Sequence, residues 1–192
     1  MVKCQPYESL IIANTDINDA DMQHLAKLKN LHWLMLRGTQ LNEPGIQTLA
    51  EIKSLGSLHL PSTTTDQCLL HIAGLTNLAS LHVGESLVTD EGLLHLKGLT
   101  NLETLGLDNT KITGKGLVHL KGLSKLKVLG LQNAPLENGG LEHLKTMTGL
   151  KQLILTNTKV TAVGVAELQK ALPGCKIEWD GGVIEPKVST DR

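Results

Sequence analysis

Hydrophobic residues return along the chain in the pattern L-x-x-L-x-L. The fourth position of the pattern is always leucine, at Leu10, Leu34, Leu58, Leu81, Leu105, Leu129 and Leu153. The sixth position is aliphatic in every copy, as in Ile12, Leu36 and Val83. Because these residues alternate with variable ones, each copy predicts a short strand that buries one face.

The copies are spaced almost evenly. They begin at Tyr7, Leu31, Leu55, Leu78, Leu102, Leu126 and Leu150. The interval is 24 residues except in the third copy, where a deletion within PSTTTDQC reduces it to 23. A repeat of this length is typical of a solenoid.

The second half of each copy predicts a turn and a short helix. A threonine column follows the strand and includes Thr39, Thr110 and Thr158, whose hydroxyls can bind turn backbone that would otherwise be buried unpaired. Helix-start residues such as Thr89 and Asp90 come next. Leucines then recur three residues apart and predict a buried helix stripe.

Stacked units bury together what one unit cannot bury alone. Strands stack about 4.8 Å apart, whereas helices need roughly 8–10 Å. The stack therefore curves, with a parallel sheet on the concave side and helices on the convex side. We expect a lead-in over residues 1–6, seven units over 7–172, a cap over 173–180 and a flexible tail over 181–192.

These columns resemble the leucine-rich repeat family from residue 7 to about residue 179. LETLGLDNTKITGKGLVHLKGL is close to a consensus unit, and the pattern is similar to the helix-bearing repeats of many bacterial members and of ribonuclease-inhibitor-like arcs. LQKALPGCKIEW resembles a closing segment, in which Ile177 and Trp179 cover the last unit. The resemblance implies a right-handed α/β solenoid that binds a protein or peptide.

Recognition in a curved solenoid is normally built on the outward strand positions. Trp33, Met35 and Arg37 share one strand and have the composition of a binding hot spot. Another interpretation is that Trp33 packs over the uncovered first unit. The glycines Gly106 and Gly130 leave bare backbone, either for a ligand or because curvature disfavours bulk. The predicted partner-binding set is Trp33, Met35, Arg37, His59, His82, Gly106, Asp108, Gly130, Gln132 and Ile154.

Histidines form two groups. His24, His71, His95, His119 and His143 share one helix column, which we interpret as structural, beside the glycine column of Gly92, Gly116 and Gly140. His59 and His82 face each other on neighbouring strands, about 5 Å apart at Cβ. With Asp108 they form the one candidate metal site, although no third well-placed ligand is evident. We therefore predict no metal and no cofactor.

Composition narrows the class of partner. The net charge is −1 and aromatic residues are 2% of the chain, which does not favour nucleic acid or an anionic membrane. The three cysteines, Cys4, Cys68 and Cys175, are interpreted as free thiols. We find no signal peptide and no membrane span, and expect a cytoplasmic protein.

The leading hypothesis is a non-enzymatic module that binds a protein or peptide through its concave face. One alternative is a scaffold segment of a larger protein whose activity lies in another domain. A metal-dependent enzyme at the concave histidines is the third. No N-terminal cap is visible, so we expect a monomer or a weak homodimer formed through the first unit.

Overall fold

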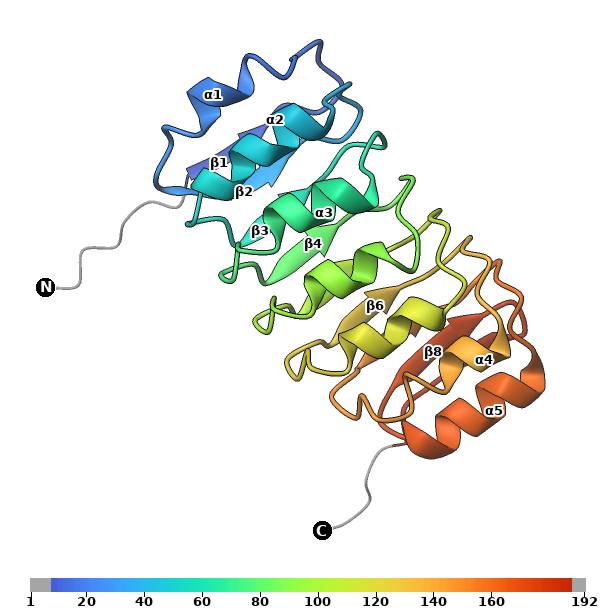
Figure 1. Cartoon of the computed structure of the whole chain (residues 1–192). Helices are drawn as coiled ribbons and strands as arrows, with labels where there is room; N and C mark the ends of the chain where they lie inside the picture. Colours follow the sequence, from blue (N-terminus) through green and yellow to red (C-terminus); the bar gives the residue numbers. More distant parts are fainter. Residues whose placement is uncertain (1–7, 188–192) are drawn as a thin grey trace, which may run out of the picture.

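Every copy of the leucine pattern forms a strand in the computed structural model, which describes residues 8–187 (Figure 1). The strands are β1 (Glu8–Ile11), β2 (Leu31–Met35), β3 (Ser57–His59), β4 (Ser80–His82), β5 (Thr104–Gly106), β6 (Val128–Gly130), β7 (Gln152–Ile154), β8 (Lys176–Trp179) and β9 (Gly182–Ile184). They form one sheet in chain order. The first eight strands are parallel and β9 is antiparallel.

Short helices pack on one face of this sheet (Figure 1). They are α1 (Met22–Leu25), α2 (Glu43–Gln47), α3 (Asp66–Ile72), α4 (Asn138–Leu141) and α5 (Ala162–Ala171), with the 3₁₀-helices η1 (Thr48–Glu51), η2 (Gly92–Leu96) and η3 (Lys115–Leu120). The chain is an α/β solenoid, as the repeat predicts.

The core lies between the sheet and the helices and is built from the repeated aliphatic columns. Leu34, Leu58 and Leu81 pair in register and are fully buried. The threonine column behaves as expected, because Thr39 and Thr110 each donate to the carbonyl three residues earlier at 2.7 Å. In the shortened unit, Thr64 stands where the other units have an aliphatic residue. Its hydroxyl donates a hydrogen bond to the Pro61 carbonyl at 2.6 Å.

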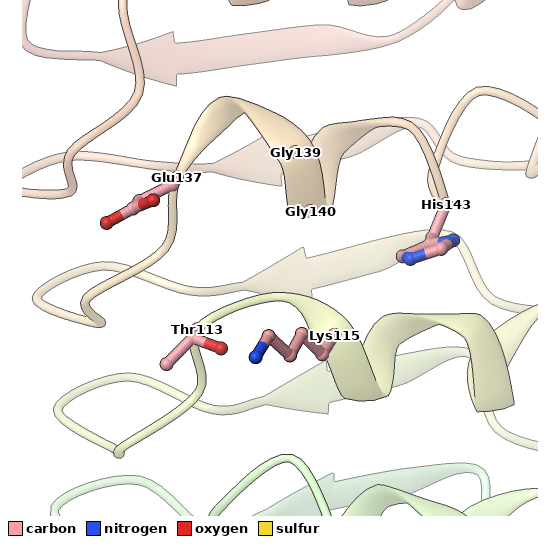
Figure 2. Close-up of a pocket in the computed structure, with 6 residues that line it drawn as sticks. All are labelled: Thr113, Lys115, Glu137, Gly139, Gly140 and His143. Atoms are coloured by element: carbon pink, nitrogen blue, oxygen red, sulfur yellow. The ribbon is translucent and has the colours of Figure 1, made fainter.

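Glycines bring neighbouring convex elements close together. Gly140 packs against Gly114, whose φ of +112° favours glycine. Beside this contact, between η3 and α4, the convex face is hollowed by about 340 Å³. Figure 2 shows Glu137 and His143 on either side of Gly139 and Gly140, with Thr113 and Lys115 on the neighbouring unit. A Cβ on Gly139 would meet nothing within 4 Å, so the hollow is open at this glycine.

The C-terminal segment closes the solenoid. Ile177 in β8 is fully buried and pairs with Leu153, and Trp179 packs against the core from a half-buried position. The tail that we predicted from residue 181 is wrong at its beginning, because β9 returns along β8. Gly182, with a φ of +120°, permits the reversal, and Ile184 packs on the core. The predicted tail residues 188–192 lie outside the described residues.

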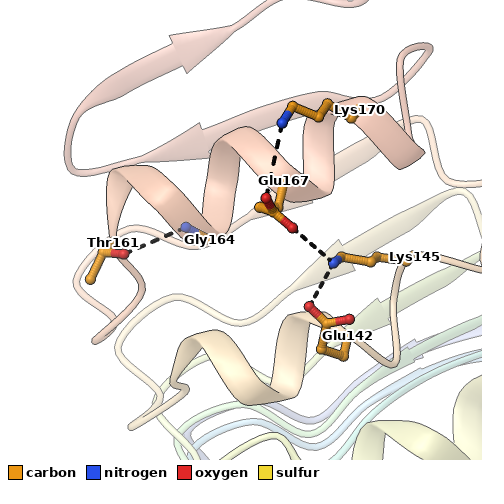
Figure 3. A network of polar contacts seen from close by, with 6 residues as sticks. All are labelled: Glu142, Lys145, Thr161, Gly164, Glu167 and Lys170. Atoms are coloured by element: carbon orange, nitrogen blue, oxygen red, sulfur yellow. Dashed lines mark hydrogen bonds and ion pairs between the residues drawn. The ribbon is translucent and has the colours of Figure 1, made fainter.

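Ion pairs join the last two convex helices. Figure 3 shows Lys145 between Glu142, at 2.6 Å, and Glu167, at 3.4 Å. The Thr161 hydroxyl accepts a hydrogen bond from the Gly164 amide at 3.5 Å and caps α5. The side chains of Glu142, Thr161 and Glu167 are largely exposed, so the network adds only modestly to stability.

The first unit is less well covered than the inner ones. Leu10, Ile12 and Leu25 are only partly buried, whereas the equivalent residues of the next unit are fully buried. Among the described residues, the first unit is therefore less buried than the second, and the lack of an N-terminal cap stays a prediction. The predicted lead-in of residues 1–6 lies outside the described residues.

Candidate functional site

Three rings line up on the concave face across β2, β3 and β4. Met35, His59 and His82 occupy one register row, and Trp33 lies two residues before Met35. The His59 and His82 rings stack with centroids 4.1 Å apart and planes at 21°. Trp33 meets His59 edge-on at 6.4 Å. All three rings are half-buried, so the sheet holds them but leaves part of each exposed.

Charged side chains border these rings where the strands end. Arg37 forms an ion pair with Glu85, although the two residues come from units that are not neighbours. The Asp108 carboxylate lies against the backbone of Gly84, where an added Cβ would clash with it. Together with His59 and His82 these groups line a shallow hollow of about 140 Å³, with Leu60 in the lining.

Sequence analysis missed Glu85. It occupies a turn position that is serine in the shortened unit (Ser62) and asparagine or glycine in the others, as in Asn109 and Gly38, and it has a φ of +59°. Left-handed backbone is unfavourable for a glutamate, and strain of this kind is found most often where function requires the side chain. A glutamate in an asparagine column is the signal that could have revealed it.

The two concave glycines do not expose their backbone, contrary to our expectation. Both are buried. A Cβ on Gly106 would come within 2.6 Å of Nδ1 of His82, and one on Gly130 would come within 3.1 Å of Oε1 of Gln132. The His82 and Gln132 side chains therefore lie across the glycines. The Gln132 Oε1 atom is buried and has no hydrogen-bond partner among residues 8–187.

The remaining candidates lie on the same face but outside the ring cluster. Ile154 is half-buried and pairs in register with Gly130, two strands away from Gly106. At the other end of the row, Ile11 pairs with Met35 and is 61% exposed. The row thus places apolar side chains at both ends of the concave face.

Burial keeps both concave imidazoles neutral. Desolvation, together with the charges of His82 and Arg37, lowers the pKa of His59 to about 4. Desolvation also lowers the pKa of His82, although the nearby Asp108 carboxylate acts against this. At neutral pH these rings therefore offer polar atoms and flat apolar faces without positive charge.

The lowered pKa of His59 gives a direct prediction. In an NMR titration, the His59 ring signal should shift with a midpoint near pH 4, well below the ordinary value of about 6.5. The unfolded chain takes up this proton near pH 6.5, so stability should fall as the pH drops from there toward 4. A His59→Gln variant should lose the His59 share of this dependence, whereas the share of His82 remains. A midpoint near 6.5 would contradict the observed burial.

The ring arrangement does not suit a shared metal ion. Because the His59 and His82 planes are nearly parallel, their nitrogen lone pairs do not converge on one point. No group of three or more histidine, cysteine or acidic side chains within residues 8–187 is placed to hold a metal. In the convex column His71 contacts Glu43 at 3.0 Å, and His95, His119 and His143 are half-buried.

The thiols are placed as packing residues. Cys68 and Cys175 are free and buried, and burial raises the pKa of Cys175 to about 11. A thiol with so high a pKa is a poor nucleophile at neutral pH. Cys4 lies outside the described residues. Across the described chain, no hydroxyl or thiol is hydrogen-bonded to His59 or His82.

Two solved structures share this architecture. An internalin (inlF) of Listeria monocytogenes superposes with a TM-score of 0.73 at 26% identity, over 90% of this chain and 47% of its own. Internalin C2 of the same organism superposes with a TM-score of 0.70 at 22% identity, over 89% of this chain and 80% of its own. The chain has a leucine-rich repeat fold.

This leucine-rich repeat protein spans about half the length of the first internalin. No protein-family model and no curated protein sequence gives a match to it. Within its described residues, no helix is both long enough and apolar enough to cross a bilayer.

Proposed function

We propose that this leucine-rich repeat protein is a non-enzymatic module that binds a protein or peptide through its concave face. The observation that carries the proposal is the cluster of partly exposed rings, Trp33, His59 and His82, on three consecutive strands. Large, pre-oriented aromatic side chains beside an arginine are typical of interface hot spots. The cluster is held by the sheet, so little conformational freedom remains to be lost on binding.

Polar groups around the rings supply specificity in this proposal. Arg37 and Glu85 are largely exposed and present opposite charges at the rim of the hollow. The unpaired Oε1 atom of Gln132 is a buried acceptor, which is unfavourable in the free protein. A donor on the partner, met by a small rotation of Gln132, would remove this penalty. Met35 and Ile154 extend the apolar contact along the row.

The test compares three baits in affinity capture from a lysate of the source organism. The concave variant carries Trp33→Ala, Met35→Ala and His82→Ala. The control carries Val163→Ala, at an exposed apolar position in the convex helix α5. We expect wild type and control to retain the same protein, with affinity roughly 30-fold or more weaker in the concave variant. The captured protein is then purified and its Kd measured directly.

Equal retention by all three baits would overturn the concave assignment. Capture of nothing by a folded wild-type bait would instead favour the scaffold alternative. The homodimer formed through the first unit also stays a prediction, and light scattering across a concentration series tests it. A strictly constant monomer mass would reject it.

A further inference from the structure

The convex face carries an exposed apolar row that the concave function does not use. Leu70 in α3, Leu94 in η2 and Val118 in η3 occupy the same repeat position and are 47%, 41% and 38% exposed. Gln47 and Glu142 fill that position in the flanking units, so the fold accepts polar residues there. An apolar row where polar residues suffice indicates a contact surface.

Lysines follow this row along the same helix faces. Lys97 and Lys121 come three residues after Leu94 and Val118, which places them on the same side of their elements. The segments 97–103, 121–127 and 145–151 lead from the helices to the next strands. They contain six lysines and one acidic residue, Glu103, which is paired with Lys127 at 2.7 Å. Within the described residues, no carboxylate pairs with Lys97 or Lys121.

The hollow between η3 and α4 lies at the end of this row. It measures about 340 Å³ and is lined by Thr113, Lys115, Glu137, His143 and the two glycines of α4 (Figure 2). The Glu137 carboxylate pairs with Lys159 at 3.6 Å. Lys115 precedes Val118 by three residues, so the hollow continues the face that carries the apolar row. A Cβ on Gly139 would meet nothing within 4 Å, which shows that this side of the hollow is open.

We propose that this convex surface, formed by Leu70, Leu94, Val118, Lys97, Lys121 and the hollow beside Gly139, docks an acidic amphipathic segment of a protein partner. Its apolar side chains lie on the row, one of them enters the hollow, and its carboxylates face the lysines. The surface is on the opposite side of the solenoid from the ring cluster, so it provides a second contact that does not depend on the concave one.

Charge and composition favour a polypeptide over other anionic partners. The elements that form this surface contain no arginine and no phenylalanine, tryptophan or tyrosine. Nucleic-acid surfaces usually combine arginine forks with stacking rings. Helices that lie on membranes carry a longer apolar face, often with aromatic residues. Here each short helix exposes a single aliphatic side chain, which suits the spaced contacts of one amphipathic segment.

The test uses fluorescence anisotropy with a labelled synthetic peptide whose helical pattern places leucines on one face and glutamates beside them. Two variants target the surface: Lys97→Glu with Lys121→Glu, and Gly139→Trp, which fills the hollow from an open position. The control, Lys111→Glu with Lys187→Glu, makes the same change of charge elsewhere. We expect saturable binding to wild type and control, weakened about tenfold or more in each surface variant.

Further binding measurements distinguish an acidic peptide partner from a basic peptide, a membrane or DNA. A peptide with lysine in place of glutamate should not bind, and vesicles of phosphatidylcholine with phosphatidylserine and a DNA duplex should bind no better to wild type than to the lysine variant. The concave variant should bind the acidic peptide normally, so this result is independent of the concave function. Absence of saturable peptide binding, equal binding by all variants, or lysine-dependent binding of vesicles or DNA alone would overturn the proposal. Circular dichroism confirms that each variant is folded.

Discussion

Replacing Gly140 by alanine should destabilise the protein by about 2–3 kcal/mol, because the added methyl group has nowhere to go. Its Cβ would lie 2.7 Å from the Cα of Gly114 and 2.6 Å from Cδ1 of Leu136. The leucine can rotate, but the Gly114 backbone is held in its turn by a hydrogen bond from its amide to the Asp90 carboxylate. The two units must therefore move apart, which disturbs the packing on both sides.

The neighbouring glycine provides a matched control. Gly139 is in the same short helix, and a Cβ there would meet nothing within 4 Å. Gly139→Ala should raise stability by roughly 0.5–1 kcal/mol, because alanine restricts the unfolded chain and favours helix. Thermal unfolding should separate the two variants by several degrees, since about 1 kcal/mol shifts Tm by roughly 2–4 °C at this size. Equal Tm values would show that the units are not in the close contact described.

The fold could be predicted from the repeat because its buried strand positions accept only apolar residues. Leu34, Leu58 and Leu81 must face the same core, so a shift by one residue would move them all to solvent. The 24-residue interval then places equivalent residues on neighbouring strands. The placement of His59 beside His82 on the neighbouring strand followed from that register, and the structure adds that the two rings stack.

Side-chain direction within the site could not be predicted in the same way. Glycine at positions 106 and 130 is compatible both with open backbone and with a neighbouring side chain lying across it, and the repeat pattern does not distinguish them. The structure shows His82 and Gln132 in that space. The Arg37–Glu85 ion pair was equally hidden, because it joins units that are not adjacent and depends on an unusual backbone conformation at Glu85.

The antiparallel strand β9 was missed for a related reason. DGGVIEPKVSTDR has a polar composition and lies beyond the last repeat, so the pattern gave no register for it. Only the reversal at Gly182 places Ile184 against Ile177. Two apolar residues, Val183 and Ile184, after a glycine turn are too weak a signal for a strand.

Asp90→Ala should destabilise the protein by about 2–3 kcal/mol, because one carboxylate satisfies the start of the next helical segment. It accepts hydrogen bonds from the Thr113 amide at 3.1 Å, the Thr113 hydroxyl at 2.5 Å, the Gly114 amide at 3.1 Å and the Gly116 amide at 2.8 Å. Without Asp90, these donors around the Gly114 turn have no replacement acceptor. Asp16→Ala, at an exposed carboxylate that makes no hydrogen bond in the described chain, should be nearly neutral.

Asparagine should restore part of the loss, because another unit already uses it at the equivalent position. Asn138 accepts from the Thr161 amide at 2.9 Å and donates to the Thr161 hydroxyl at 2.8 Å. Asp90→Asn should therefore lie between wild type and Asp90→Ala in urea unfolding at neutral pH. If Asp90→Ala is no less stable than Asp16→Ala, the carboxylate does not hold the two units together.

The Asp90 carboxylate should also make the unfolding free energy depend on pH in the acidic range. Burial alone would raise the pKa of Asp90, but the hydrogen bonds from Thr113, Gly116 and Gly114 together lower it below its ordinary value. The folded protein therefore favours the ionised form, and its stabilising effect is complete above about pH 4. It is lost as the pH falls through the lowered pKa. The difference in unfolding free energy between wild type and Asp90→Asn should accordingly shrink below pH 4, and a difference that stays constant to low pH would contradict this assignment.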